Sequence, residues 1–268
     1  TADGQDFAVP GVRSLDNAKT RFVTSSVEQI KASGYFVTLG ADYAGRYIAD
    51  ALVRRDGSSL FGSNDRWHTY YRVSGAWRVA QESWWKWDAV NEFKLRVSQG
   101  TAGGRPSFND QYETFSFSTA GGVSKQTLGN KNLRPERATE TEMGIDAIVK
   151  QRYSVQLSYA KTRTVDELIS IPLAGFFGYN AQWQNAGTVE GNTIEGTLEA
   201  QVVKRPNLTW KVGLVADRSR NKVTEFNRSC FSTGTIGYRC AGVGLTEMYG
   251  FQFLHDTTYL QADARARA

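Results

Sequence analysis

The chain has 268 residues, which suits one or two globular domains, and it carries a net charge of +5 with a pI near 9.1. A mean hydropathy of -0.44, with no apolar run near ~20 residues, excludes a helical membrane protein. The densest basic pair, Arg54-Arg55, is neutralised by Asp56, so we expect no nucleic-acid partner.

The first part of the chain is weakly patterned. We expect residues 1–33 to form a loop with one short strand at 21–30. The first residues, Thr1 to Gly4, lack the basic start and apolar stretch of a signal peptide. A chain with 26 glycines and 12% aromatic residues otherwise favours many strands joined by turns. We therefore expect a fragment of a longer all-β protein.

The alternation of apolar and polar residues predicts strands with one apolar face. In 70–79, for example, Tyr71, Val73 and Trp77 face one way, and Arg72 and Arg78 face the other. About eight such strands are expected between residues 34 and 221. They lie at 34–43, 46–54, 70–79, 93–99, 141–149, 153–159, 193–202 and 210–217.

The connections between these strands alternate in length along the chain. Long connections are expected at 56–68, 101–137 and 164–189, and residues 222–268 are expected to be a further long loop and the start of the next strand. The others are short, or of medium length at 80–90. Transmembrane β-barrels have short turns on one side of the membrane and long loops on the other, whereas a soluble sandwich has no reason to sort its loops. The sequence therefore predicts an antiparallel up-and-down transmembrane β-barrel.

Bulky charges are predicted on the inward side of neighbouring strands. They are Arg46, Arg72, Arg78, Lys94 and Arg96. A closed barrel of eight strands has a narrow, packed interior, so these charges favour part of a wider barrel. Aromatic residues are predicted at strand ends, where a membrane meets water, although a core cluster would also use them. They are Trp84, Trp85 and Trp87 at one end and Trp67, Tyr70 and Tyr71 at the other.

The sequence offers little evidence of catalysis. His68 and His255 are far apart, with no cysteine or carboxylate at a metal-ligand spacing. Glu140 and Glu142 share a strand face, as a glycosidase pair could, but charges facing a lumen are the favoured interpretation. We expect no enzymatic activity and no cofactor.

The cysteines Cys230 and Cys240 lie ten positions apart in a predicted outer loop. They could form a disulfide in an oxidising compartment or remain two free thiols.

Three segments carry a family resemblance. Residues 128–147, LGNKNLRPERATETEMGIDA, resemble the late-barrel signature of TonB-dependent outer-membrane transporters. Residues 51–67, ALVRRDGSSLFGSNDRW, and 73–85, VSGAWRVAQESWW, resemble the SusC/RagA branch, in the C-terminal part of its barrel. The motif positions are Arg54, Arg55, Asp56, Gly57, Asn132, Leu133, Pro135, Glu136, Glu140 and Gly144.

This resemblance implies import of an oligosaccharide or peptide across the bacterial outer membrane. Family members close about 22 strands around a plug. The implied partners are the lipid bilayer, a TonB complex acting on the plug, and a SusD/RagB-like surface lipoprotein. We expect the plug domain and the signal peptide to be absent from these residues. The alternatives are a small passive barrel or a soluble carbohydrate-binding sandwich.

Aromatic side chains in the long loops are candidates for substrate contact. Their rings could stack on sugars or hold a peptide, or they could instead pack loop on loop or meet a lid protein. These residues are Phe108, Tyr112, Phe115, Phe117, Phe176, Phe177, Tyr179 and Trp183.

Overall fold

The computed structural model describes residues 2–8, 10, 18–23, 28–62, 65–117 and 122–250, and it contains two units, Thr1–Lys31 and Ala32–Ala268. In the first unit, β1 (Ala2–Phe7) pairs antiparallel with β2 (Ala18–Val23). The loop expected over 1–33 is therefore wrong for these residues, and the short strand expected at 21–30 overlaps β2 only over 21–23. Pairing between strand backbones requires no alternation of apolar and polar side chains, so the sequence pattern did not predict this hairpin.

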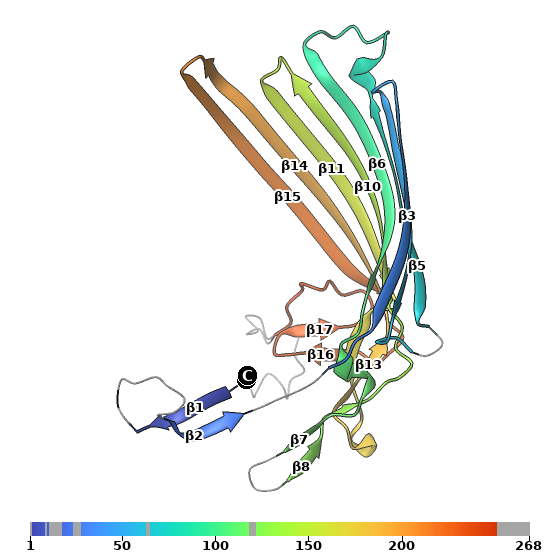
Figure 1. Cartoon of the computed structure of the whole chain (residues 1–268), viewed down its shortest axis with the longest axis vertical. Helices are drawn as coiled ribbons and strands as arrows, with labels where there is room; N and C mark the ends of the chain where they lie inside the picture. Colours follow the sequence, from blue (N-terminus) through green and yellow to red (C-terminus); the bar gives the residue numbers. More distant parts are fainter. Residues whose placement is uncertain are drawn as a thin grey trace, which may run out of the picture. The chain divides into compact units, whose positions relative to one another are not determined.

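The second unit is built on one antiparallel sheet whose eight strands neighbour one another in chain order (Figure 1). They are β3 (Ala32–Tyr43), β4 (Tyr47–Ser58), β5 (Trp67–Arg78), β6 (Val90–Gly104), β10 (Glu136–Val149), β11 (Tyr153–Val165), β14 (Thr188–Arg205) and β15 (Leu208–Glu225). Within the described residues the edge strands β3 and β15 do not pair with each other, so the sheet is an open wall. This confirms the predicted up-and-down arrangement of about eight strands.

Most short connections lie at one end of this sheet and most long ones at the other (Figure 1). One end, which we call the turn end, has the connections 44–46, 150–152, 206–207 and 79–89, the last containing the 3₁₀ helix η2 (Val79–Gln81). The other, the loop end, has 59–66, 105–135, 166–187 and the chain after residue 225. The predicted alternation of short and long connections is present in the structure with one exception, since 79–89, predicted to be of medium length, is longer than 59–66, predicted to be long.

The tight turns have the backbone geometry that a hairpin needs. Ala44 and Gly45 have φ of 57° and 67°, and the Arg46 N–H donates to the Tyr43 carbonyl at 3.1 Å. Two successive positive φ values are typical of the type I′ turn, whose twist matches that of the flanking strands. The turn at 150–152 repeats this pattern with φ of 50° and 53°.

The two faces of the sheet differ in chemistry. Register places Trp77, Leu95, Ile145 and Leu157 in one row across β5, β6, β10 and β11, on what we call the apolar face. Its side chains lie on the surface, with Leu39 70% and Leu214 64% exposed. Tyr71, Val73 and Trp77 are exposed, and Phe93, Leu95 and Val155 are half-buried, so none of them lies in a dry core. The opposite, polar face carries the charged residues.

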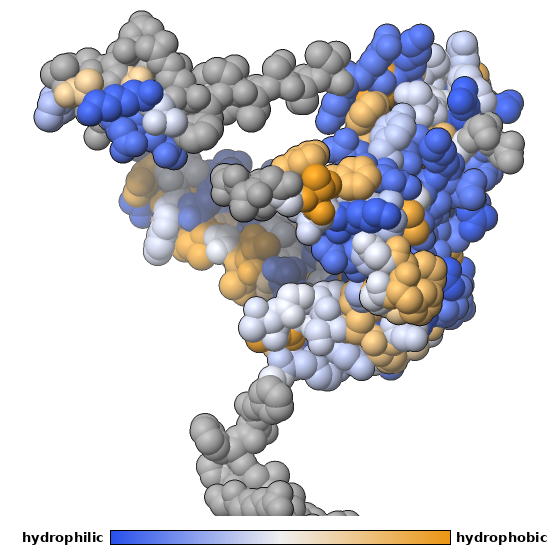
Figure 2. Space-filling model, turned by 90° about the horizontal axis from the view of Figure 1, so that it is seen from below, coloured by the Kyte–Doolittle hydropathy of each residue, from blue (hydrophilic) through white to orange (hydrophobic). Residues whose placement is uncertain are grey.

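Buried apolar side chains gather instead at the loop end. They include Leu60, Phe61, Leu133, Ile169, Ile171, Ala186, Val189 and Val223. At the turn end, the strand expected over 70–79 is corrected by one residue, because β5 ends at Arg78 and Val79 begins η2 with 5% of its surface exposed. Viewed from the loop end, the surface is mostly hydrophilic, with apolar residues in separate patches (Figure 2).

The strands are longer at the loop end than the alternation predicts. β6 runs to Gly104, β11 to Val165 and β15 to Glu225, well past the expected ends at 99, 159 and 217. Both faces meet water beyond an apolar band, so side-chain alternation stops while backbone pairing continues. The strand expected to start near the end of the chain lies outside the described residues.

The loops contain short elements of their own. These are η3 (Phe108–Gln111), β7 (Phe115–Phe117), β8 (Val123–Lys125), β9 (Thr127–Leu128), β12 (Leu168–Pro172), η4 (Gly175–Phe177), β13 (Ala181–Asn185), β16 (Phe231–Thr233) and β17 (Gly237–Arg239). Among the described residues, no helix has the length and apolar character needed to cross a lipid bilayer.

Candidate functional site

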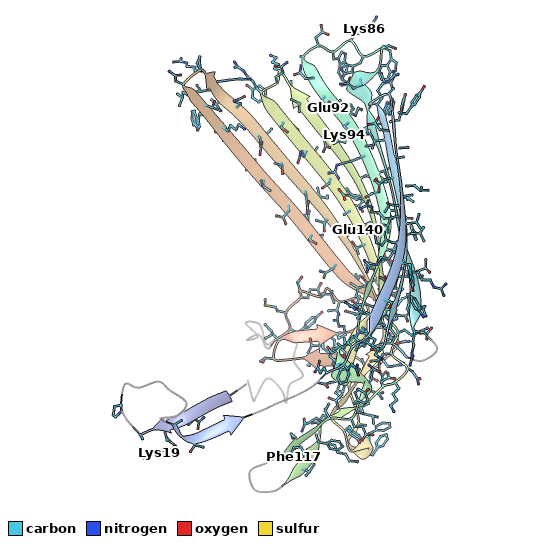
Figure 3. All side chains as sticks on the ribbon, in the orientation of Figure 1. Lys19, Lys86, Glu92, Lys94, Phe117 and Glu140 are labelled. Carbon is cyan, nitrogen blue, oxygen red and sulfur yellow. A yellow bond between two sulfur atoms is a disulfide. The ribbon has the colours of Figure 1, made fainter. Side chains whose placement is uncertain are left out.

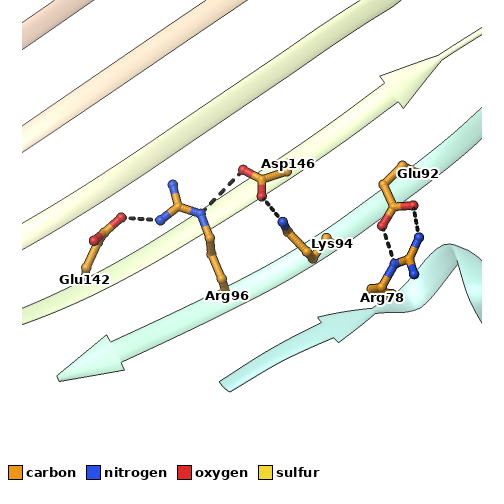
Figure 4. A network of polar contacts seen from close by, with 6 residues as sticks. All are labelled: Arg78, Glu92, Lys94, Arg96, Glu142 and Asp146. Atoms are coloured by element: carbon orange, nitrogen blue, oxygen red, sulfur yellow. Dashed lines mark hydrogen bonds and ion pairs between the residues drawn. The ribbon is translucent and has the colours of Figure 1, made fainter. Parts of the chain in front are cut away.

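Ion pairs link neighbouring strands on the polar face (Figure 4). Arg78 donates two hydrogen bonds to Glu92, at 2.8 and 2.9 Å, and Lys94 pairs with Asp146 at 2.7 Å. Lys86 marks the turn end, Phe117 the loop end, and Glu92, Lys94 and Glu140 lie between them (Figure 3). Charged groups need water or partners, so this face suits a wet lumen.

Gly144 of the family motif makes room for part of this network. It lies directly opposite Arg96, whose guanidinium crosses it to reach Glu142 and Asp146. A Cβ atom on Gly144 would lie 2.5 Å from the guanidinium carbon. Glu142 thus serves an interstrand ion pair, and Glu140 accepts a hydrogen bond from a threonine on β11 at 2.9 Å. Glu142 is therefore engaged in an ion pair, and Glu140 in a hydrogen bond, between neighbouring strands.

At the loop end, two long connections are joined by a small sheet. β13 pairs antiparallel with β12 in its own loop and parallel with β9 of the loop 105–135. We call β9, β12 and β13, together with residues 129–136, the loop platform. The platform fixes loops that are far apart in the sequence.

Asn130 is the residue that ties these loops most directly. Its Nδ2 donates to the Trp183 carbonyl at 2.8 Å, and its Oδ1 accepts from the Asn132 N–H at 3.0 Å. Its own N–H donates to the Asp110 carbonyl at 3.0 Å. Gly129 before it lies so close to residues 111–113 that a Cβ atom would be 2.6 Å from the Gln111 oxygen. Asn130 and Gly129 therefore suit the contacts with residues 110–113 and with Trp183 as well as the local turn.

Leu133 connects the platform to a third loop. Its side chain is 1% exposed, and its carbonyl accepts from the Gly62 N–H at 3.1 Å. Pro135, two residues later, is also buried. The apolar part of the motif therefore packs at the base of the platform.

Side chains on either side of Pro135 reach the loop 166–187. Asn185 accepts from the Arg134 N–H at 2.9 Å and donates to the Arg134 carbonyl at 2.8 Å. Arg134 also pairs with Asp166 at 3.0 Å, and Glu136 accepts from the Leu168 N–H at 3.1 Å. Sequence reasoning missed Asn185, because a single asparagine in a long loop gives no signal of its partner.

The chain after β15 packs against the same loop. Phe226 and Phe231 contact the cluster of Ile169, Ile171 and Ala186. Arg239 of β17 pairs with Glu167 at 3.2 Å, and burial raises the pKa of Glu167 although Arg239 opposes that shift.

A disulfide closes the segment that contains β16 and β17. The structure joins Cys230 to Cys240, with Cα atoms 4.7 Å apart. This cross-link spans the hairpin of β16 and β17.

The candidate ligand-binding aromatics divide into exposed and packed groups. Phe117 is 78% and Phe176 84% exposed, whereas Tyr179 is buried beneath Lys125, whose Nζ lies 4.8 Å from the ring centroid. A hydrogen bond to Glu113, with burial, raises the pKa of Tyr179. Phe176 and Phe177 lie 4.3 Å apart between ring centroids.

The remaining candidates are neighbours of these segments. Tyr112, Phe115 and Phe177 are exposed, and Phe108 and Trp183 are half-buried. The rings of Phe108 and Tyr112 lie 5.4 Å apart. The platform brings the two loops that carry these rings together, through the pairing of β9 with β13.

The motif residues of β4 lie at its loop end. Arg54 pairs with Asp56 at 2.7 Å, and the Arg55 guanidinium lies 5.8 Å from the centroid of the Trp67 ring. A Cβ atom on Gly57 would lie 2.8 Å from the same ring. This part of the motif therefore sets the position of Trp67.

Aromatic rings border both ends of the apolar face. At the turn end, ring centroids of Tyr47 and Trp77 lie 6.3 Å apart, and those of Trp77 and Trp84 lie 6.4 Å apart. At the loop end, Tyr35 stacks on Trp67 at 6.0 Å. Trp67 and Trp77 are ten residues apart on β5. At about 3.3 Å per residue and a tilt of about 40°, they span about 25 Å, the height of the apolar band of membrane barrels.

The two histidines have no common site. His68 Nε2 lies 2.6 Å from the Asp65 carbonyl oxygen, and its ring contacts Phe61. His255 lies outside the described residues. In the part of the chain that the structure describes, no three His, Cys, Asp or Glu residues are grouped to hold a metal ion.

An open wall with an exposed apolar face, a charged opposite face and its two longest inter-strand loops at the same end is typical of one class of protein, the transmembrane β-barrels. The chain matches the family model "TonB dependent receptor-like, beta-barrel" over residues 2–246, and it belongs to that family. The family and the fold predicted from the sequence are thereby confirmed.

Two individual relatives are less than 30% identical to the chain. The chain is 29% identical to TonB-dependent receptor P39 of Formosa agariphila over 87% of its length, covering 23% of that protein. It is 25% identical to TonB-dependent receptor SusC of Bacteroides thetaiotaomicron, over 78% of its length and 22% of SusC. The chain thus spans about a quarter of the length of these relatives.

Solved structures share the fold. The RagAB peptide importer in its closed-closed state superposes with a TM-score of 0.73 at 21% identity, over 89% of this chain and 28% of that one. Its open-open state gives a TM-score of 0.67 over 84% of this chain.

Proposed function

We propose that this chain supplies barrel wall and extracellular loops to a TonB-dependent importer of the SusC/RagA type, in the outer membrane of a bacterium. The substrate is an oligosaccharide or a peptide. In the whole protein, a TonB complex acts on a plug domain, and a SusD/RagB-like surface lipoprotein serves as the lid.

One observation carries this proposal. The loop platform holds several long loops in fixed positions at one end of a charged wall, and it leaves aromatic rings exposed there. A passive or structural barrel has no need for ordered loops with exposed rings. Exposed rings favour a sugar face or a peptide side chain as the ligand, because both offer apolar surface beside polar groups.

Relatives support the same proposal. SusC is named a TonB-dependent receptor, and RagAB is described as a peptide importer. Only the RagAB description states a cargo, so the loops of this chain decide between glycan and peptide.

The test uses the full-length parent protein in detergent. Its binding to a mixture of malto-oligosaccharides and to a tryptic peptide pool is measured for the wild type and for a Phe117→Ala/Phe176→Ala/Phe177→Ala variant. Loss of each stacking ring should weaken binding by about 2–10-fold. Trp87→Ala is the matched control, since Trp87 is 68% exposed at the opposite end.

Two results would count against this proposal. Binding that is unchanged in the ring variant would remove these loops from the substrate site. Uptake that persists in cells lacking TonB would favour the passive barrel instead.

A further inference from the structure

The apolar face changes character within β11, β14 and β15. The register aligns Tyr159, Ile194 and Arg218 across these strands. The next row toward the loop end is Lys161, Asn192 and Arg220, and the one after it is Arg163, Glu190 and Lys222. The residues of this face nearer the turn end include Leu157, Leu198 and Leu214, all exposed. A cationic rim, defined as Lys161, Arg163, Arg218, Arg220 and Lys222, therefore borders the apolar band.

On β15, the rim begins about one height of the apolar band from the turn end of the strand. Trp210 and Arg220 are ten residues apart on β15, as are Trp77 and Trp67 on β5. The same rise of about 25 Å therefore separates each pair. Arg220 therefore lies one height of the apolar band from Trp210, with Arg218 just inside that distance and Lys222 just beyond it.

Only part of the positive charge of the rim is neutralised. Glu190 pairs with Lys161 at 3.8 Å and with Arg163 at 3.2 Å, and Arg163 also lies 3.7 Å from Glu225. Arg218, Arg220 and Lys222 are exposed and make no ion pair with the described residues.

A hollow of about 780 Å³ lies beside these cations. Lys161, Arg220 and Lys222 contribute cations to its lining, and the carboxylates are those of Glu190 and Glu247. Glu247 already accepts a hydrogen bond from Tyr249 at 3.1 Å. The hollow therefore has a net positive lining.

We propose that the cationic rim binds the anionic, phosphate-bearing head groups of lipids in the leaflet at the loop end. Such a lipid meets both parts of the surface, since its acyl chains lie on the apolar face and its phosphate lies among the cations. Guanidinium and ammonium groups make strong charge-assisted hydrogen bonds to phosphate, and cations next to a membrane surface favour anionic lipid. This inference rests on the membrane placement in the proposed function, and it is independent of the substrate.

The test titrates the full-length protein in detergent with phosphatidylglycerol and, separately, with phosphatidylcholine, and counts bound lipids by native mass spectrometry. The wild type should prefer phosphatidylglycerol. Arg218→Gln/Arg220→Gln/Lys222→Gln should reduce that preference, by about fivefold for each cation removed. Lys204→Gln/Arg205→Gln/Lys211→Gln is the matched control, because it removes equal charge from β14 and β15 nearer the turn end.

A single variant, a competition with inorganic phosphate and a substrate-binding measurement complete the test. Arg220→Gln alone should reduce the preference about fivefold, and it serves if the triple variant does not fold. Millimolar inorganic phosphate should not displace the lipid, and displacement would identify a free-phosphate site instead. A wild type without preference, or equal losses in the rim and control variants, would overturn the proposal. Substrate binding should be unchanged in the rim variant, so the two proposals fail separately.

Discussion

Replacing Asn130 with alanine should loosen the loop platform without unfolding the wall. The substitution removes two hydrogen bonds. One is the part-buried bond to the Trp183 carbonyl, and the other is the exposed bond from the Asn132 N–H, within the motif. A typical intramolecular hydrogen bond contributes about 0.5–1.5 kcal/mol net, so the loss should be about 1–3 kcal/mol. That corresponds to an opening equilibrium about 5–150-fold larger.

Hydrogen–deuterium exchange measures this change amide by amide. The protection of β9 and β13 should fall in Asn130→Ala, while the wall strands keep theirs, because local opening exposes only the amides of the platform. Asn132→Ala is the matched control: Asn132 is exposed, and only its backbone N–H makes a hydrogen bond in the described residues. Equal protection in the two variants would refute the role assigned to Asn130.

Three other predictions concern the wall and its loops. Gly144→Ala should displace the opposing guanidinium and destabilise the barrel by about 1 kcal/mol in thermal unfolding, whereas Gly213→Ala, whose Cβ would have no contact under 3.9 Å, should not. Cys230 and Cys240 should yield no reactive thiol in the unfolded, unreduced protein and two after reduction; two thiols before reduction would contradict the cross-link.

The third of these is a pH dependence. Burial raises the pKa of Asp110, and the hydrogen bond from the Ser107 N–H only partly opposes it. The folded loop therefore holds this proton more tightly than the unfolded loop, so its stability should increase as pH falls from neutrality through the folded-state pKa. Exchange protection of residues 107–112, corrected for intrinsic rates, should show this increase, and Asp110→Asn should abolish it. The same slope in that variant would assign the effect to another group.

The wall could be predicted from the sequence because its physical cause is local. A strand between lipid and water must alternate apolar and polar residues, as Tyr71 to Trp77 do, and each strand shows this without reference to its neighbours. Connection lengths then indicated which ends of the strands lie together. Inward charges such as Lys94 and Arg96 could also be expected to meet carboxylates on the next strand.

The loop platform could not be predicted in the same way. Asn130 bonds to Trp183 and Asn185 to Arg134, contacts between loops whose lengths and partners no local pattern specifies. Strand ends were missed at the loop end for a related reason: past Tyr159, for example, β11 continues through Lys161 and Arg163, where both faces meet water. The sequence also could not distinguish buried from exposed aromatic residues in these loops: Tyr179 is buried, whereas Phe176 is exposed.

The most direct test of the central claim is a spin-label scan along β11 of the full-length protein in a bilayer, in a Cys230→Ser/Cys240→Ser background. Labels at 155, 157 and 159 should be accessible to oxygen dissolved in lipid, and labels at 154, 156 and 158 to a water-soluble nickel complex. This alternation with a period of two follows from a strand between hydrocarbon and a wet lumen. If labels at 155, 157 and 159 were shielded from both reagents, the apolar face would be a dry core, and the barrel wall described here would be contradicted.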